Sequence, residues 1–266
     1  MIKSVLVTGG GRGIGREIAI TFAKAGHDVM ICARSEKELA ATAKESDKIK
    51  YVVSDLSADE GPQAAVRATI QAFERLDVVI TCAGIYGPMG RFDTQDLKQW
   101  KETIKTNLFG TIGCVHAALP KLLKTKGSII CIAGAGVPSP LPNLSAYSVS
   151  KAGIVQFVTG IAKEYPEIQC NTVAPGAVAT RLVDDVLAAG PEIVGKEFFE
   201  KNAAWKKGEQ GVISASVAAS FILDLVTNQR QVTGKYLSAV WDKDLSAPDP
   251  DMFTLKRIDG RNFRKA

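Results

Sequence analysis

The stretch Ser4-Val-Leu-Val-Thr-Gly-Gly-Gly-Arg-Gly-Ile-Gly15 joins a short apolar run directly to a glycine-rich turn. The run is typical of a buried strand, and Ile14, Ile18 and Phe22 recur at the spacing of one helix face. Glycine lets the backbone approach a phosphate closely, and a helix start offers free N–H groups. We therefore expect a strand, turn and helix that bind a cofactor pyrophosphate; a glycine turn without a ligand is the alternative.

Further short apolar runs alternate with helical stretches along the chain. After residues 4–8, the runs are 28–33, 49–54, 78–82, 128–132, 168–173 and 234–239, and alanine-rich helical stretches cover 58–74, 149–164 and 211–226. Such nearly continuous apolar runs suit strands that are covered on both faces. The alternating order predicts an α/β fold of Rossmann type: a doubly wound, mostly parallel, seven-stranded sheet with helices on both faces.

Composition limits the classes of protein that fit. The chain has 266 residues, of which 46% are hydrophobic and 23% charged, which excludes a disordered chain, a coiled coil and a collagen-like repeat. No composition break occurs before about residue 240. We therefore expect a single cofactor-binding catalytic domain over 1–240, which includes a substrate-side segment at 181–207. An irregular basic tail follows at 241–266.

Charge and cysteine usage favour a cytoplasmic protein. The net charge of +5 is mild, and no recognisable module or concentrated patch predicts nucleic-acid binding. No run approaches the roughly 20 apolar residues of a membrane helix, and the N-terminus lacks the form of a secretory signal. The cysteines are scattered singly, at Cys32, Cys82, Cys114, Cys131 and Cys170. They predict buried thiols in a reducing compartment, with neither a disulfide framework nor a metal site.

Beyond the glycine turn, several motifs follow one another in a characteristic order. They are Thr81-Cys-Ala-Gly84, Asn107 within Thr-Asn-Leu-Phe-Gly, Tyr147-Ser-Val-Ser-Lys151, and Asn171 followed by Pro175-Gly176 and Thr180. Together with the spacing Gly9-x3-Gly13-x-Gly15, they resemble the short-chain dehydrogenase/reductase family from about residue 4 to residue 240. Thr81 and Cys82 depart from the family's Asn-Asn-Ala-Gly, because both amide side chains are lost.

The resemblance implies a nicotinamide dinucleotide cofactor and the residues that hold it. These are Gly9, Gly11, Arg12, Gly13, Ile14, Gly15, Arg34, Asp55, Leu56, Ala83, Gly84, Tyr147, Lys151, Pro175, Gly176, Val178 and Thr180. Asp55 stands where the family contacts the adenine, and the residues from Pro175 onward stand where it closes over the nicotinamide.

The choice between NAD and NADP rests on charge near the adenosine ribose. A carboxylate after the second strand would bind the 2′-hydroxyl, whereas an arginine there would accept a 2′-phosphate. This strand ends in Arg34, and Arg12 adds a second guanidinium beside the glycine turn. Glu36 is the one nearby feature against, and two solvated surface arginines are the alternative. We expect NADP(H).

Tyr147 and Lys151 predict the proton-transfer machinery. The two residues are one turn apart on a predicted helix, and an ammonium beside a phenol is expected to lower the phenol's pKa. The resemblance implies that Tyr147 donates the proton, that Lys151 also holds the nicotinamide ribose, and that Asn107 connects Lys151 to solvent through a water.

One family residue is missing. The family places a serine after the fifth strand to bind the substrate carbonyl, and Gly134 occupies that position here. The substrate or a water could supply the missing hydrogen bond, or Ser139 or Ser145 could loop back. Otherwise the protein binds cofactor without much turnover. We expect an active enzyme whose substrate contacts Gly134 and Asn143.

Three classes of function stay open at this point. The leading one is an NADP(H)-dependent oxidoreductase that interconverts a carbonyl and an alcohol. The alternatives are an NADP-binding protein with little or no turnover and a non-redox member of the fold. The aromatic and basic stretch 181–207 predicts either an aromatic lid with a basic rim or an amphipathic helix with solvated lysines. The expected partners are a small carbonyl or alcohol substrate and further copies of the chain, in a homodimer or homotetramer.

Overall fold

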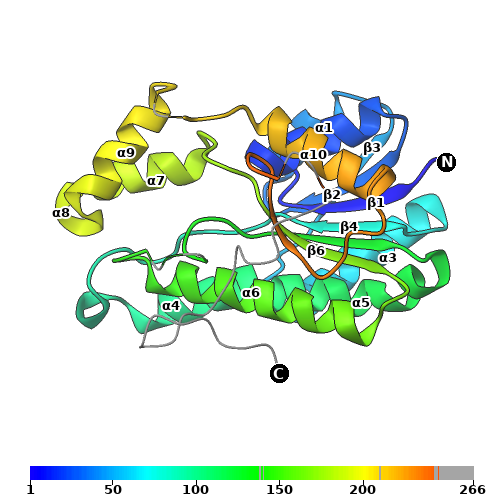
Figure 1. The fold of residues 1–266 in the computed structure, drawn as a ribbon, viewed down its shortest axis with the longest axis horizontal. Helices are drawn as coiled ribbons and strands as arrows, with labels where there is room; N and C mark the ends of the chain where they lie inside the picture. The colour runs from blue at the N-terminus through cyan, green and yellow to red at the C-terminus, as the bar shows by residue number, and fades with distance from the viewer. Residues whose placement is uncertain (138, 140, 210, 243–244, 246–266) are drawn as a thin grey trace.

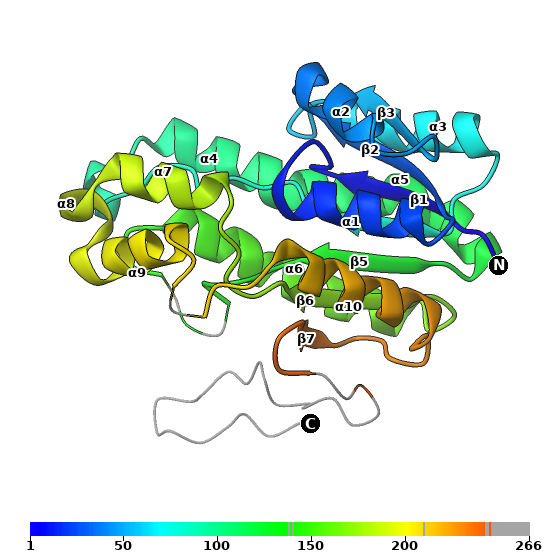
Figure 2. The same cartoon turned by 90° about the horizontal axis from the view of Figure 1, so that it is seen from above.

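A computed structural model describes residues 1–266 except 138, 140, 210, 243–244 and 246–266. The described residues form one seven-stranded sheet in the order β3-β2-β1-β4-β5-β6-β7 (Figure 2). The strands are β1 (Ser4–Thr8), β2 (Asp28–Ala33), β3 (Ile49–Val53), β4 (Val78–Thr81), β5 (Ser128–Ile132), β6 (Gln169–Ala174) and β7 (Tyr236–Ser238). Each pair of neighbouring strands is parallel, so the expected doubly wound sheet is confirmed and is entirely parallel.

Helices cover both faces of the sheet (Figure 1). On one face lie α1 (Gly13–Lys24) and α10 (Ala215–Thr227); on the other lie α3 (Gly61–Phe73), α5 (Gly110–Thr125) and α6 (Ser145–Glu164). The short α2 (Glu36–Ala43) joins β2 to β3. Two apolar clusters fill the two layers, one centred on Phe22 and Ile222 and the other on Leu122 and Ile154. This double burial explains the nearly continuous apolar strands.

Two helical regions differ from the sequence-based expectation. The chain between β4 and β5 contains η1 (Phe92–Thr94), α4 (Leu97–Ile104) and a single π-turn, η2 (Lys105–Phe109), before α5. None of these helical turns stood out in the sequence. The segment 181–207 forms α7 (Arg181–Ala189), α8 (Pro191–Val194) and α9 (Lys196–Lys206). Gly190 and Gly195 separate these helices, with φ of 83° and 88°, which glycine adopts without strain.

The helices α7 to α9 lie beyond one edge of the sheet (Figures 1 and 2). The glycine turn follows β1, and the segment leading to α7 follows β6, so this is the edge formed by the carboxyl ends of the strands. Open parallel α/β sheets bind their ligands outside this edge. The predicted tail 241–266 falls almost entirely outside the described residues. Within the part of the chain that the structure describes, no helix is long and apolar enough to cross a membrane.

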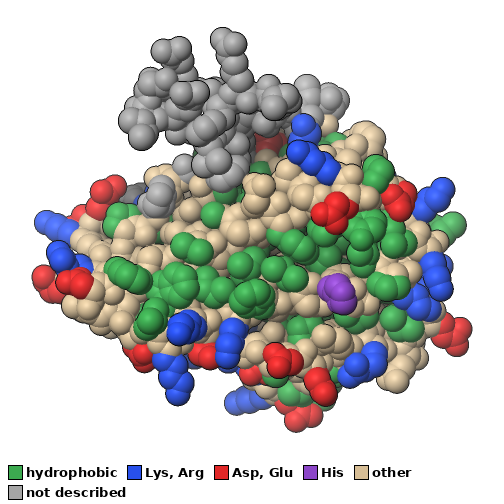
Figure 3. Space-filling view, turned by 90° about the horizontal axis from the view of Figure 1, so that it is seen from below, with side chains coloured by type: hydrophobic (Ala, Val, Ile, Leu, Met, Phe, Trp, Pro, Cys, Tyr) green, Lys and Arg blue, Asp and Glu red, His purple; other side chains and the backbone are tan. Residues whose placement is uncertain are grey.

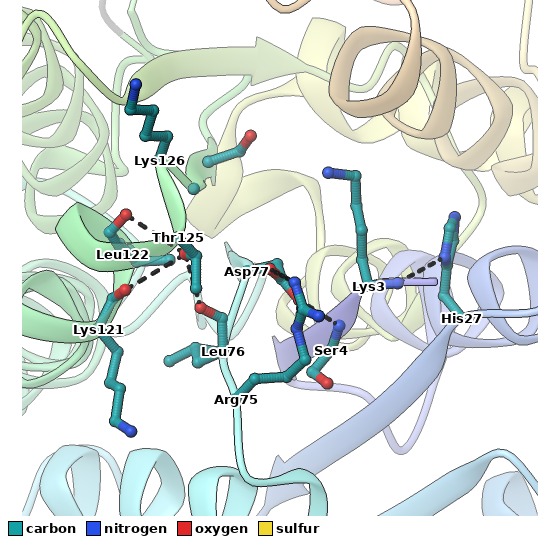
Figure 4. A network of polar contacts seen from close by, with 12 residues as sticks. Lys3, Ser4, His27, Arg75, Leu76, Asp77, Lys121, Leu122, Thr125 and Lys126 are labelled. Carbon is teal, nitrogen blue, oxygen red and sulfur yellow. Dashed lines mark hydrogen bonds and ion pairs between the residues drawn. The ribbon is translucent and has the colours of Figure 1, made fainter. Parts of the chain in front are cut away.

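A polar network closes the opposite edge of the sheet (Figure 4). The buried carboxylate of Asp77, just before β4, accepts hydrogen bonds from the Ser4 amide at 2.8 Å and from the Arg75 guanidinium at 2.8 and 2.6 Å. The hydroxyl of Thr125, at the end of α5, donates to the Leu76 carbonyl oxygen at 3.0 Å. These bonds fasten the start of β1 and the end of α5 to the chain that enters β4, away from the candidate site.

Candidate active site

The glycine turn and the loop after β4 are tied together at the carboxyl edge of the sheet. The hydroxyl of Thr8 accepts hydrogen bonds from the amides of Cys82 at 3.0 Å and Ala83 at 3.1 Å. Gly9 packs so closely against this loop that a Cβ atom on it would lie 2.9 Å from Ala83. The predicted cofactor residues Gly9 and Ala83 therefore touch, because glycine allows backbone to pack on backbone.

The turn itself has the form of a phosphate cradle. A Cβ atom on Gly15 would lie 2.4 Å from the Gly9 carbonyl oxygen, so the helix start can approach the turn only with glycine there. Gly13 has a φ of 54° and opens α1, whose N-cap residue Arg12 makes no side-chain cap. Gly11 is held in place because its carbonyl oxygen accepts a hydrogen bond from the Thr42 hydroxyl at 3.2 Å. The N-terminus of α1 thus keeps its positive end available to an anion.

The segment after β6 closes the other side of this cradle. A Cβ atom on Gly13 would lie 3.4 Å from the Thr180 side chain, so these two predicted cofactor residues face each other. A cavity of about 390 Å³ opens beside them, between the glycine turn and the end of α9, and its lining includes Val178, Thr180, Trp205 and Ser214. Gly176 turns the chain with a φ of 86°. An open cavity beside a helix N-terminus without a side-chain cap suits an anionic group, so the residues at the glycine turn fit a cofactor phosphate.

Arg34 and Asp55, the charged residues predicted to bind the adenosine, lie near each other. Arg34 is exposed after β2, and Asp55 is exposed after β3. Burial acts to raise the pKa of Asp55, but hydrogen bonds from Ser57 and the positive charge of Arg34 outweigh it and lower the pKa. Arg12 already has a partner, because its guanidinium lies 3.4 Å from the Glu38 carboxylate. Leu56, in contrast, is buried in the apolar cluster that contains Leu122 and Ile154.

Asn107 is fully buried in the π-turn that precedes α5. Its side-chain oxygen accepts from the Ile85 amide at 2.9 Å, and its amide donates to the Ile85 carbonyl at 2.9 Å and to the Ser150 hydroxyl at 3.0 Å. A Cβ atom on Gly84 would lie 3.4 Å from Asn107 Oδ1 and 3.5 Å from Lys151 Nζ. Asn107 thereby links the loop after β4 to α6, the helix that carries Tyr147 and Lys151.

Tyr147 and Lys151 are brought together in the first turns of α6, as their spacing predicted. Both are buried, with exposed fractions of 6% and 4%. The Lys151 ammonium donates to the Ile132 carbonyl oxygen at the end of β5, at 2.9 Å, and lies 5.7 Å from the centre of the Tyr147 ring. The end of β5 therefore anchors the lysine beneath the tyrosine.

The expected lowering of the Tyr147 pKa is wrong for this structure. Burial raises the pKa of Tyr147 well above 10, and the nearby Tyr86, Tyr236 and Cys82 raise it further. Burial also lowers the pKa of Lys151, which the thiols of Cys82 and Cys131 only partly oppose. Removing water from a phenolate destabilises it more than an ammonium at this distance stabilises it. The tyrosine therefore stays neutral.

Gly134, which was predicted to occupy the position of the family's serine, lies beside the tyrosine hydroxyl. A Cβ atom on Gly134 would lie 3.5 Å from Tyr147 Oη, in ordinary van der Waals contact, but the φ of 148° is one that L side chains rarely adopt. The two serines that could have looped back do not replace the missing one. Ser139 is exposed, and the Ser145 hydroxyl accepts from Trp100 at 3.0 Å and donates to Gln95 at 3.3 Å.

The surroundings of Tyr147 on the side of α7 to α9 are apolar. Buried Tyr86, Leu144, Val186 and Val194 pack with Tyr147, and partly buried side chains from α7 to α9 join them, among them Leu182, Phe198 and Phe199. The sequence analysis missed Tyr86, because no local pattern marks a loop residue that packs across the sheet edge. The carbonyl of Asn143 accepts from the Gly90 amide at 3.0 Å, and its side chain lies near the start of α9.

The lysines of α9 point away from these apolar surroundings. Lys196 is exposed, and Lys206 forms a 2.7 Å ion pair with Asp184 on α7. The side of these helices that faces Tyr147 is therefore aromatic and aliphatic, and the basic side faces solvent. Of the two alternatives for 181–207, the structure favours amphipathic helices with solvated lysines over an aromatic lid with a basic rim.

Comparison with known proteins assigns the family. Residues 3–189 match the profile of the family described as short chain dehydrogenase, and the chain belongs to this family. The chain is 33% identical to the short chain dehydrogenase/reductase astE of Aspergillus oryzae, over 83% of this chain and 90% of that protein. It is 29% identical to the uncharacterized oxidoreductase YIR035C of Saccharomyces cerevisiae, over 90% of this chain and 96% of that protein.

Solved structures agree with this assignment. The crystal structure of YIR035C superposes with a TM-score of 0.83 at 28% identity and covers 93% of this chain and 99% of its own. A variant of actinorhodin polyketide ketoreductase, solved with NADPH, superposes with a TM-score of 0.80 at 27% identity and covers 89% of this chain and 95% of its own. The protein is an oxidoreductase of the short-chain dehydrogenase/reductase family that acts on alcohol or carbonyl groups with a nicotinamide cofactor.

Proposed function

We propose that the protein is an NADP(H)-dependent oxidoreductase that interconverts a carbonyl and an alcohol, with Tyr147 as the proton donor and acceptor. The observation that carries this proposal is the buried arrangement around Tyr147: Lys151 lies 5.7 Å from its ring, and the position of Gly134 lies beside its hydroxyl. NADP(H) is favoured because Arg34 and Arg12 flank the adenosine end and no carboxylate follows β2 directly.

In the proposed reaction, Tyr147, Lys151 and Asn107 have different roles. The cofactor, when bound, supplies the hydride in reduction or accepts it in oxidation. Tyr147 gives its proton to the carbonyl oxygen during reduction and takes the proton from the alcohol in the reverse reaction. Lys151, fixed by the Ile132 carbonyl, places a positive charge near the phenolate that forms. Asn107 holds the loop after β4 against α6, so that Gly84 stays over Lys151.

The apolar residues around Tyr147 support an apolar carbonyl compound as the substrate. Tyr86, Phe198 and Leu144 lie on the substrate side of Tyr147, and closing such a pocket over a substrate excludes water from the proton transfer. We place the substrate between this apolar cluster and the loop at Gly134. Asn143 lies at the edge of the pocket, next to the start of α9.

A second function is supported by one specific observation. Gly134 provides no hydroxyl for the substrate carbonyl, and loss of one preorganised donor costs roughly 10²–10³ in rate. A protein that binds NADP(H) but turns over little is therefore the alternative. The two functions differ in one measurable respect: the alternative binds the cofactor but consumes no NADPH with any carbonyl compound.

We also propose that the chain pairs with itself through the face formed by α5 and α6. Apolar side chains form a band across the side of the molecule that carries α4, α5 and α6 (Figure 3). Phe109 and Val149, on this side, are more than half exposed at 59% and 51%. Exposed apolar bands of this kind mark interfaces.

The five free cysteines, four of them buried, support the reducing environment of the cytoplasm.

The test of the enzymatic proposal is a panel of ketones, sugars and quinones, followed by NADPH absorbance. We expect at least one apolar ketone to be reduced. Tyr147→Phe keeps the ring and removes the proton donor, so turnover should fall by roughly 10²–10⁴ while NADPH affinity changes little. Tyr51→Phe, which alters an exposed tyrosine on β3, is the matched control and should behave like the unmodified protein. Normal turnover by Tyr147→Phe would show that the active site is misassigned.

A further inference from the structure

A second tyrosine lies against Tyr147 at the edge of the pocket. Tyr86 belongs to the loop after β4, and Gly134 belongs to the loop after β5; these two strands are neighbours in the sheet. The rings of Tyr86 and Tyr147 meet edge to face, with centroids 4.7 Å apart and an angle of 72° between their planes. The Tyr86 ring therefore contacts the Tyr147 ring from the loop after the strand next to the one that leads to Gly134.

Tyr86 is held in place by the residues on either side of it. Asn107 binds both the amide and the carbonyl of Ile85, each at 2.9 Å, so the backbone before Tyr86 is fixed in two directions. After it, Gly87 packs directly on α4, since a Cβ atom there would lie 1.9 Å from Thr103 Oγ1. The Tyr86 side chain itself is only 9% exposed. A group fixed in this way is preorganised, as an efficient hydrogen-bond donor to a reacting oxygen must be.

The hydroxyl of Tyr86 is available to a ligand. Among the described residues the Tyr86 hydroxyl has no hydrogen-bond partner, and it is not one of the fully buried polar atoms without a partner, which belong to Gln63, Thr81, Asn202 and Trp205. Burial, together with the negative charge of Asp185, raises the pKa of Tyr86 to about 12, so the hydroxyl stays protonated at neutral pH. Tyr236, the other tyrosine at this edge, is already engaged, because its hydroxyl donates to the Gly134 carbonyl oxygen at 3.3 Å.

We propose that Tyr86 takes the place of the missing serine: its hydroxyl donates a hydrogen bond to the substrate carbonyl oxygen, next to the hydroxyl of Tyr147. In reduction, the carbonyl oxygen gains the proton of Tyr147 as the carbonyl carbon gains the hydride, and Tyr86 keeps its own proton throughout. This inference rests on the proposed carbonyl–alcohol activity. It explains how a site with Gly134 can stabilise the charge that develops on the carbonyl oxygen.

The experiment compares Tyr86→Phe with Phe198→Leu, using a small ketone and a bulky apolar ketone from the panel. Tyr86→Phe keeps the ring and its packing but removes the donor. Because the carbonyl is common to both substrates, kcat/KM should fall by a similar factor for both, on the order of 10²-fold. Phe198 lies on the other side of Tyr86, with ring centroids 6.5 Å apart, and has no donor to lose. Phe198→Leu should therefore lower kcat/KM more for the bulky ketone than for the small one.

NADPH affinity and thermal stability, measured for both variants, separate a local effect from a general one, and both should match the unmodified protein for Tyr86→Phe. A loss in Tyr86→Phe that depends on substrate size would make Tyr86 a pocket wall only and overturn the inference. Unchanged kcat/KM in Tyr86→Phe, with turnover still lost in Tyr147→Phe, would overturn the inference and leave the proposed function standing. If the unmodified protein reduces nothing in the panel, the proposed function fails and the inference fails with it.

Discussion

The hydroxyl of Tyr236 donates a hydrogen bond to the carbonyl oxygen of Gly134 at 3.3 Å, which ties β7 to the loop after β5. Tyr236 is buried, and it packs with Ala133 and Val137 on either side of the glycine. The loop is thus fixed with Gly134 at a φ of 148°, a conformation that suits glycine and strains any L side chain. The backbone at position 134 is therefore suited to glycine and not to a residue with a side chain.

This arrangement predicts that restoring the serine does not restore a conventional site. Gly134→Ser adds a hydroxyl close to Tyr147 but also adds backbone strain of roughly 1–2 kcal/mol. Gly134→Ala adds the same strain without the hydroxyl and is the matched control. We expect both variants to lose similar unfolding free energy and the serine variant to raise KM for the best substrate of the panel. Chemical denaturation and steady-state kinetics on a small and a bulky ketone measure these effects.

The opposite result would identify a degraded site. If Gly134→Ser raised kcat/KM on every ketone with unchanged stability, while Gly134→Ala did not, the pocket would still be shaped for a serine. The inference about Tyr86 would then lose its main reason, since the serine position would remain the natural place for the second donor.

We expect Arg34 to determine the preference for NADPH over NADH. A guanidinium and a 2′-phosphate form a charge-assisted contact worth about 1.5–3 kcal/mol, which is roughly one to two decades of affinity. We expect the unmodified protein to bind NADPH more tightly than NADH and Arg34→Asp to reverse much of the preference. Arg67→Asp changes the charge equally on an exposed position of α3 and should leave the preference unchanged. Equal affinity of the unmodified protein for both cofactors, measured by fluorescence titration, would contradict the assignment.

The strands could be predicted from the sequence because they are covered on both faces. The ranges 4–8, 28–33 and 128–132 agree residue for residue with β1, β2 and β5, and the other strands differ by one or two residues at one or both ends. Burial on both sides leaves a continuous apolar run, which needs no neighbouring information to recognise. The pairing of Tyr147 with Lys151 was predictable for a similar reason, since residues four apart on a helix share a face.

The remainder of the site depends on contacts that no local pattern records. The π-turn around Asn107 is set by bonds to Ile85 and Ser150, which are distant in sequence. Tyr86, in the loop after β4, contacts Tyr147 on α6, and Arg12 forms an ion pair with Glu38 on α2. The raised pKa of Tyr147 also follows from burial, which depends on how α7 to α9 pack over it. These features come from the tertiary arrangement, so spacing along the chain could not predict them.

The network at the amino edge of the sheet should contribute stability without affecting the site. Asp77→Ala removes the acceptor for the buried Ser4 amide and for Arg75, so we expect a loss of about 1–3 kcal/mol in unfolding free energy. Asp28→Ala breaks a partly exposed pair with Lys48 at 3.2 Å and should cost less than about 1 kcal/mol. Cofactor affinity should be unchanged in both variants. A change in NADPH binding by Asp77→Ala would mean that the two edges of the sheet are coupled.

Lys151 should lower the stability of the folded chain while it serves the reaction. Its pKa is lowered by burial, so the unfolded chain binds this proton more tightly than the folded one. The resulting loss of unfolding free energy is fully present below the lowered pKa of Lys151. It disappears as the pH rises from that value toward 10.5, the ordinary pKa of lysine. Lys151→Met removes the buried charge. We therefore expect it to raise the unfolding free energy at neutral pH by on the order of 1 kcal/mol, even though the bond to the Ile132 carbonyl is lost.

The gain in Lys151→Met should shrink as the pH is raised through the alkaline range, because the unmodified protein then loses the same charge. Turnover, in contrast, should be strongly reduced at neutral pH, where Tyr147 in the variant lacks the positive charge that stabilises its anion. Lys163→Met, at an exposed position near the end of the same helix, is the control and should change stability by less than about 0.5 kcal/mol. Denaturation curves at several pH values measure the difference. A Lys151→Met variant that is less stable than the unmodified protein at neutral pH would show that the Ile132 bond outweighs the cost of burying the ammonium.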